Sequence, residues 1–355
     1  MSISSSGSAA RAARPRRARG GPGVLAPVVL AASLAVHGAR PSQPAAELPG
    51  RVPAVVTSAC VVVDPSRSTY DYVTGTTLPG RVLRVEVRRP AGRRRSLPTI
   101  LFAPGYDATP GTYARLLDAW ARAGFAVISP TFPDTSPAAV ARARRGDPED
   151  DLVNQPADLA FVARRAVAAS GSPDRECPAL DGLVDPRELG LAGQSDGGDT
   201  VAMLAYDRAA PYAGLDRGLG VRAVAVLSGA EVGPGPFEAV TGDPALLVVQ
   251  SATDRCNPPQ ESVELYDAIV QRDRWFLELR EAAHLPPYDG ADPAAFSAVT
   301  RVTTRFFLLE LRGASPRAGF LAFGDAEPGV ARLTTGPDAP PLGALAPSVA
   351  ACAAR

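Results

Sequence analysis

Short apolar runs alternate with amphipathic segments from about residue 82 onward. The apolar runs have the length of buried strands, and the segments between them repeat their apolar positions at helical spacing. Strands are predicted at residues 82–88, 98–103, 125–129, 189–192, 221–227, 245–250 and 275–279. Helices are predicted at residues 112–123, 152–169, 199–208, 259–271 and 293–311.

This alternation of strands and helices predicts an α/β fold. Strands that alternate with helices form a mostly parallel sheet with helices on both faces. In such sheets, ligands bind outside the carboxyl ends of the strands. The loops that follow the predicted strands are therefore where the chemistry is expected.

The first 39 residues have the pattern of a secretory signal peptide. Residues 1–23 hold five arginines and no acidic residue, and an apolar stretch of 13 residues follows at 24–36. That stretch is shorter than the roughly 20 residues of a membrane helix, and Pro27 interrupts it, so no stable membrane span is expected. A twin-arginine signal at Arg16 and Arg17, or a leader without an export role, is the alternative.

The remaining chain divides into three expected parts. Residues 40–57 resemble a Pro/Ala linker, residues 58–313 hold the α/β domain, and residues 314–355 form an extension rich in Gly, Pro and Ala. Residues 320–323 are a candidate strand within that extension.

Four cysteines, Cys60, Cys177, Cys256 and Cys352, all follow the expected signal peptide. An even set of this kind suits two disulfides in an oxidising compartment, and a secreted or extracytoplasmic location is expected. Their wide spacing has no CxxC element, which argues against a metal site. The sequence leaves the three pairings open, and buried free thiols are the alternative.

The charged residues and histidines of the chain argue against several classes of function. All 37 basic residues are arginine, and they balance 37 acidic residues. Without lysine, Schiff-base chemistry and a phosphate-binding GK[ST] loop are excluded. Two histidines are too few for a His-rich zinc centre, and balanced charge argues against nucleic-acid binding. The arginines between residues 88 and 95 surround a predicted turn and are expected to face solvent.

The strongest chemical signal is the segment LGLAGQSDGG at residues 189–198. It is a predicted strand that ends in G-x-S-x-G and runs into a predicted helix, which is the nucleophile elbow of the α/β-hydrolase fold. Gly193 and Gly197 leave room for the sharp turn, and Ser195 is the candidate nucleophile. A Gly/Ser turn in a nucleotide-binding or purely structural sheet is the alternative.

A base and a carboxylate follow in the order that this fold uses. His284 comes shortly after the strand at 275–279, whereas the other histidine, His37, lies in the leader. Asp254 comes directly after the strand at 245–250. The order Ser195, Asp254, His284 is the α/β-hydrolase order. Asp243 and Asp289 are the competing carboxylates.

Two backbone amides are expected to form an oxyanion hole. One belongs to Asp196, directly after the candidate nucleophile, and the other to Tyr106, in the loop after the strand at 98–103. The Tyr106 ring is expected to form a wall of the acyl pocket, with ordinary loop packing as the alternative.

Residues 58–313 resemble secreted bacterial α/β-hydrolases of the group that joins platelet-activating-factor acetylhydrolase, chlorophyllase and cutinase-like polyester hydrolases. The resemblance is carried by the three triad segments and by residues 78–83, 104–106, 123–128 and 154–159. It implies a serine hydrolase that cleaves carboxylic esters through an acyl-enzyme, with no metal or organic cofactor.

The chain departs from that group at two positions beside the candidate nucleophile. Asp196 stands where the polyester hydrolases usually carry methionine, which disfavours an anionic or strongly hydrophobic acyl group. Gln194 replaces the usual histidine, and we expect it to support the elbow.

The 59 positions from Ser195 to Asp254 hold a helix, two strands and a loop at 229–244, so no large lid is expected. We therefore predict a monomeric esterase for small-molecule or polymeric esters. A catalytically silent binding protein with this fold, and an amidase or peptidase, are the alternatives.

Overall fold

The computed structural model describes residues 53–93, 95–229, 244–270, 273–313, 319–324 and 328–353. The expected signal peptide, most of the expected linker, Asp243 and nearly all of the loop expected at 229–244 lie outside the described residues.

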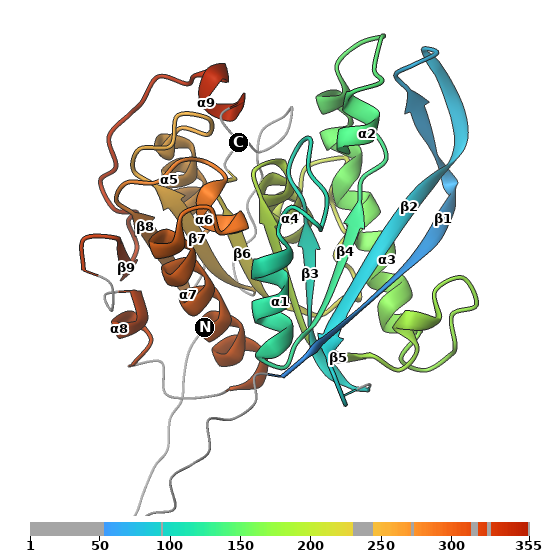
Figure 1. Ribbon diagram of the computed structural model, residues 1–355, viewed down its shortest axis with the longest axis horizontal. Coiled ribbons are helices and arrows are strands. Elements are labelled where there is room, and N and C mark those ends of the chain that lie inside the picture. Colours follow the sequence, from blue (N-terminus) through green and yellow to red (C-terminus); the bar gives the residue numbers. More distant parts are fainter. Residues whose placement is uncertain are drawn as a thin grey trace, which may run out of the picture. The chain divides into compact units, whose positions relative to one another are not determined.

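The described strands form one sheet in the order β1-β2-β4-β3-β5-β6-β7-β8-β9 (Figure 1). The six strands from β4 to β8 in this order run parallel, while β1, β2 and β9 add antiparallel edges. The strands are β1 (Val55–Asp71), β2 (Thr76–Pro90), β3 (Leu97–Ala103), β4 (Ala126–Thr131), β5 (Val184–Gln194), β6 (Val221–Leu227), β7 (Ala245–Ser251), β8 (Arg274–Leu279) and β9 (Ala331–Thr335).

Helices cover both faces of this sheet. Side chains of α3, α4 and α5 pack into one core, and those of α1, α6 and α7 pack into the other. The α-helices are α1 (Ala114–Arg122), α2 (Pro137–Val140), α3 (Gln155–Ala168), α4 (Asp196–Tyr206), α5 (Pro259–Ala268), α6 (Pro286–Asp289), α7 (Pro293–Arg312), α8 (Leu321–Gly324) and α9 (Val349–Ala353), and the 3₁₀ helices are η1 (Pro148–Asn154) and η2 (Pro178–Leu180).

The central strands are mostly apolar because both faces of the sheet are covered. Every residue of β3 and of β7 is buried. The longest helix, α7, begins where the Asp292 side chain accepts hydrogen bonds from the amides of Ala294 and Ala295, and it ends at Gly313 with a φ of 62°. These are ordinary start and stop signals, and both can be recognised in the sequence. No helix in the described part of the chain is both long enough and apolar enough to cross a bilayer.

The two edges of the sheet differ from the sequence prediction. The candidate strand at 320–323 is wrong, because Leu321–Gly324 form the short helix α8, and the last strand is β9. Strand β1 was not predicted, and its first residue, Val55, lies inside the segment expected to be a linker. An edge strand buries little, and the register of β1 against β2 shifts between Asp64 and Ser68, so its sequence pattern is weak.

The prediction that the arginines around residue 90 face solvent is wrong for Arg88. Strand β2 continues to Pro90, and the Arg88 side chain is 8% exposed. Its guanidinium donates hydrogen bonds to Glu86, at 2.7 Å, and to Asp118 on α1, at 2.5 Å. Arg93 is exposed, as predicted.

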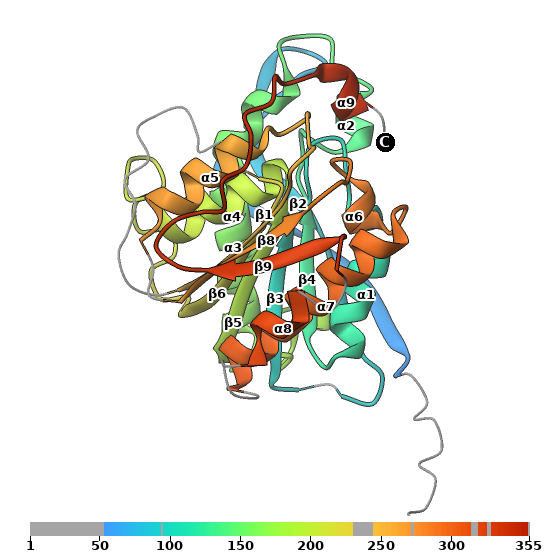
Figure 2. The same cartoon turned by 90° about the vertical axis from the view of Figure 1, so that its left-hand side faces the viewer.

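The structure contains two disulfides, which correspond to one of the three pairings that the sequence left open for the four cysteines. Cys60 on β1 is bonded to Cys177, which precedes η2, and Cys256 is bonded to Cys352 on α9. Figure 2 shows the last segment, coloured dark red, running from β9 past α5 to α9. The second disulfide therefore ties the end of the chain to the loop that follows β7.

Candidate active site

Ser195 occupies a tight turn between β5 and α4. Its φ is 56° and its ψ is −131°, a conformation that L-residues rarely adopt. A Cβ at Gly193 would lie 1.8 Å from the Gly197 carbonyl oxygen, and one at Gly197 would lie 1.9 Å from the Ala103 oxygen. Only glycine fits at these two positions, as the elbow motif predicts.

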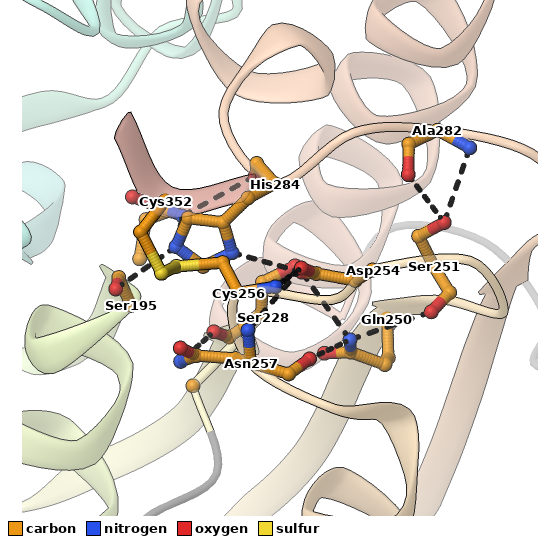
Figure 3. Close-up of polar contacts among 12 residues, drawn as sticks. Ser195, Ser228, Gln250, Ser251, Asp254, Cys256, Asn257, Ala282, His284 and Cys352 are labelled. Atoms are coloured by element: carbon orange, nitrogen blue, oxygen red, sulfur yellow. Dashed lines mark hydrogen bonds and ion pairs between the residues drawn. A yellow bond between two sulfur atoms is a disulfide. The ribbon is translucent and has the colours of Figure 1, made fainter. Parts of the chain in front are cut away.

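The structure brings together the three predicted residues Ser195, His284 and Asp254 (Figure 3). The distance from Ser195 Oγ to His284 Nε2 is 3.0 Å, and His284 Nδ1 lies 2.8 Å from Asp254 Oδ2. They come from the loops after β5, β8 and β7, which meet at the carboxyl end of the sheet. The line of contacts suits transfer of a hydroxyl proton to an imidazole that a carboxylate orients.

The Asp254 carboxylate is completely buried and is held largely by neutral donors. Its Oδ1 accepts hydrogen bonds from the amides of Cys256, at 2.9 Å, and Asn257, at 3.2 Å, and its Oδ2 accepts a longer one from Gln250 Nε2, at 3.4 Å. These hydrogen bonds offset the free-energy cost of removing the charged carboxylate from water. Of the competing carboxylates, Asp289 accepts from the Ala291 amide, at 2.7 Å, at the end of α6.

A second set of contacts fixes the loop that carries His284. Ser251 Oγ donates to the Ala282 carbonyl, at 2.8 Å, and accepts from the Ala282 amide, at 3.1 Å. Thr253 makes the same two kinds of contact with Ala282. The loops after β7 and β8 are therefore fastened together just before the histidine.

The loop after β3 lies directly against the elbow. A Cβ at Gly105 would be 2.9 Å from the Gln194 carbonyl oxygen and 3.0 Å from Ser195 Cβ, so this approach requires glycine. Tyr106 follows, and it lines the same cleft as Ser195 and Asp196. The two residues predicted for the oxyanion hole therefore flank the serine.

The sequence did not indicate that Gln194 contacts the imidazole. This side chain is 2% exposed, and its Nε2 lies 3.1 Å from His284 Nε2. Its Oε1 accepts a hydrogen bond of 2.7 Å from the Tyr113 hydroxyl, which in turn accepts one of 3.2 Å from the Gly105 amide. The available signal in the sequence was a polar residue directly after the apolar run at residues 189–193.

A cleft of about 650 Å³ opens at the serine. Its described lining residues include five carboxylates and no arginine: Asp107, Glu149, Asp196, Asp199 and Glu261. Burial raises the pKa of Tyr106 to about 12, and the negative charges of Asp147 and Glu149 add to this effect. The volume fits a drug-sized molecule.

The C-terminal segment forms part of the cleft wall through Pro347 and Cys352. Gln260 on α5 exchanges hydrogen bonds with the amide and carbonyl of Leu345, and the Ser348 amide donates to the Arg255 carbonyl, at 2.7 Å. Together with the disulfide, these contacts keep the end of the chain beside the Asp254 loop. The sequence did not indicate that this segment borders the cleft.

Comparison with known proteins supports the fold assignment. No protein-family model and no curated protein matches the chain. Among solved structures, the chain is similar to a ferulic acid esterase from Streptomyces cinnamoneus, at 19% sequence identity and a TM-score of 0.56. The match covers 77% of this chain and 94% of that one. The predicted α/β-hydrolase fold is therefore confirmed.

Proposed function

We propose that this protein is a serine hydrolase that cleaves carboxylic esters through an acyl-enzyme. The observation that carries the proposal is the line of contacts from Ser195 Oγ through the His284 imidazole to the buried Asp254, at 3.0 and 2.8 Å. The serine end of this line opens into the cleft, and the carboxylate end is closed off from solvent. A substrate can therefore reach the hydroxyl while the carboxylate is held in place by its hydrogen bonds.

In acylation, Ser195 Oγ attacks the ester carbonyl carbon while His284 Nε2 takes the hydroxyl proton. The carbonyl oxygen becomes an oxyanion, and we assign its stabilisation to the amides of Tyr106 and Asp196. The imidazolium then gives its proton to the leaving alkoxide oxygen, and the carbon–oxygen bond to the alcohol breaks.

In deacylation, water takes the place of the alcohol. His284 removes a proton from the water as it attacks the acyl carbon, and it returns that proton to Ser195 Oγ as the acid leaves. Asp254 holds the Nδ1–H throughout and stabilises the imidazolium without accepting its proton.

The similar structure and the lining of the cleft restrict the choice of candidate ester substrates. The Streptomyces protein is a ferulic acid esterase, so esters of aromatic acids join short-chain esters as candidate substrates. The five carboxylates of the lining disfavour an anionic group on either side of the ester. Two disulfides also support our proposal that residues 1–39 are an export signal and that the protein acts outside the cytoplasm.

The proposal is tested by hydrolysis of p-nitrophenyl acetate, butyrate and octanoate, and of methyl ferulate, by the wild type and by Ser195→Ala. The variant should lose about 10⁴-fold or more in kcat. Ser129→Ala, which alters a buried serine of β4 whose hydroxyl has no contact with the triad, is the matched control and should retain activity.

Two results would contradict the proposal. A wild type that neither hydrolyses esters nor reacts with a fluorophosphonate probe would indicate a silent site. Faster cleavage of p-nitroanilides than of the matching esters would replace the esterase assignment with an amidase.

A further inference from the structure

A chain of three hydrogen bonds runs behind the triad, from the loop after β3 to the imidazole. It starts at the Gly105 amide and passes through the Tyr113 hydroxyl, which is 1% exposed, to the Gln194 amide. It ends at His284, where Gln194 Nε2 lies 3.1 Å from the ring Nε2 and 3.4 Å from the main-chain oxygen.

The direction of this chain is fixed at both of its ends. The Gly105 amide can only donate, and the Tyr113 hydroxyl that accepts from it donates to Gln194 Oε1. At the other end, the His284 main-chain oxygen can only accept, and it lies 3.4 Å from Gln194 Nε2. The amide group of Gln194 must then turn its NH₂ toward His284. The orientation is thus set by the network and not by the similar shapes of the amide oxygen and nitrogen.

Two donors consequently share one acceptor. Because His284 Nδ1 faces the Asp254 carboxylate, at 2.8 Å, the ring proton belongs on Nδ1 and the lone pair on Nε2. Ser195 Oγ, at 3.0 Å, and Gln194 Nε2, at 3.1 Å, both reach that lone pair. If the ring gains a proton on Nε2, this N–H faces the NH₂ of Gln194, donor against donor.

We propose that Gln194, oriented by Tyr113, is a positioning residue that keeps the His284 imidazole neutral and directed at Ser195 to lower pH than the triad alone would. This inference rests on the proposed function, since it concerns the base of that reaction. It also links the base to the oxyanion loop, because the chain begins at Gly105, one residue before Tyr106.

Other titratable groups near the imidazole come from several elements and stay unchanged in the Gln194 variants. They are Asp254 after β7, Asp196 and Asp199 on α4, Tyr106 and Asp107 after β3, Tyr113 before α1, Glu149 on η1 and Glu261 on α5. If substitution of Gln194 alone shifts the midpoint of the pH profile of activity, the shift is therefore attributable to the Gln194 amide.

The test compares Gln194→Met, which removes the donor, with Gln194→Glu, which keeps the shape and replaces the donor with a carboxylate. The readouts are the pH profile of kcat/KM for p-nitrophenyl acetate and the pH profile of serine labelling by a fluorophosphonate. In Gln194→Met the midpoint of the acid limb should rise by roughly half to one pH unit. In Gln194→Glu it should rise further, because a carboxylate favours the imidazolium.

Two more variants separate positioning from packing. Tyr113→Phe releases the Gln194 amide and should raise the midpoint by less than Gln194→Met does. Gln155→Met is the matched control, since Gln155 is equally buried but contacts Thr135 and Thr200 instead of the triad, and it should leave the midpoint in place.

The position of His284 can also be followed without activity. The chain has only two histidines, and His37 lies in the expected leader, so ¹⁵N-histidine NMR of the exported protein reports the imidazole directly. Equal midpoints in the wild type, Gln194→Met and Gln194→Glu would overturn the inference, even if kcat fell. A wild type that the probe does not label would overturn the proposed function, and the inference with it.

Discussion

Two regions of the molecule bury aspartates beside a cationic or titratable partner, but only one of them opens to a cleft. At the triad, Asp254 faces an imidazole. In the second region, which we call the Arg81 cluster, the guanidinium of Arg81 lies between Asp151 and Asp158, with donor–acceptor distances of 2.6 to 3.0 Å. Arg81 and Asp158 are both completely buried.

The difference lies in what the partner can do with its proton. Asp254 is satisfied mainly by amide donors, so its neighbour His284 is free to gain and lose a proton during a reaction. Burial lowers the pKa of Arg81, but the hydrogen bonds and charges of Asp151 and Asp158 outweigh it and raise the pKa above its already high ordinary value, so the guanidinium stays charged. A buried carboxylate thus serves the proposed chemistry where its partner is an imidazole, which can exchange a proton, and serves architecture where its partner is a guanidinium.

The Arg81 cluster has a clear architectural role. It joins β2, which carries Arg81, to η1 and α3, which carry Asp151 and Asp158. Arg67 on β1 adds a further contact to Asp158. Because η1 also places Glu149 and Leu152 on the cleft, the cluster supports one wall of the candidate active site.

The largest effect is expected on kcat, when Asp254 of the triad and Asp158 of the Arg81 cluster are each replaced by asparagine. Asp254→Asn should lower kcat by about 10⁴-fold, because an asparagine cannot hold the correct imidazole tautomer or stabilise the imidazolium. Asp158→Asn should instead lower the free energy of unfolding and leave kcat per folded molecule within about threefold. Steady-state kinetics with active-site titration, alongside urea unfolding, measures both. A large loss of kcat in Asp158→Asn would break the distinction.

Removal of the cation should produce the next largest effect. Arg81→Met leaves buried carboxylates without their partner, and we expect a loss of about 3 to 5 kcal/mol in the free energy of unfolding at pH 7. Arg93→Met, at an exposed arginine, is the control and should change stability by less than about 0.5 kcal/mol. Equal stability of the two variants would show that the cluster is dispensable.

Asp134 should make the stability of the folded protein depend on pH. Burial, and then the negative charge of Asp151, raise the pKa of Asp134 to about 7, so the folded state binds a proton that the unfolded state has released. The resulting stabilisation is complete below about pH 4 and is lost as the pH rises through about 7. Urea unfolding of Asp134→Asn between pH 4 and 8 should therefore show a smaller decline in stability than the wild type does. Parallel curves would refute this assignment.

The charge of the cleft gives the smallest expected effect. A thioester carrying a quaternary ammonium group should have a kcat/KM several-fold higher than its neutral tert-butyl isostere, and added salt should reduce the difference. Glu149→Gln removes one exposed carboxylate of the lining and should reduce the difference in kcat/KM between the two thioesters. A preference for the neutral isostere at low salt would show that the acidic lining does not act on the substrate.

Most of the central fold could be predicted from the sequence because the buried stretches of its strands are short, mostly apolar runs. All seven expected strands and five expected helices are present, with shifted ends. The edges could not be predicted in this way. Strand β1 is half exposed, and β9 and α8 acquire their structure from contacts with β8 and α7, which no local pattern records.

The fold class, and the three residues that meet in the candidate active site, could be read from the sequence alone. Ser195, Asp254 and His284 each follow a buried strand, and the carboxyl ends of parallel strands meet at one edge of a sheet, so strand order was enough to bring them together. The elbow glycines were determined in the same local way, because the sharp turn leaves no room for a side chain.

Only the tertiary structure decided which distant side chains meet. Gln194 contacts Tyr113 across 81 positions of the chain, Arg81 contacts Asp158 across 77, and Cys256 pairs with Cys352 across 96. Hydrophobic periodicity specifies which face of an element is buried, but a buried polar residue finds its partner only when the elements pack. For this reason the order of the triad was visible in the sequence, whereas the groups that hold and tune it were not.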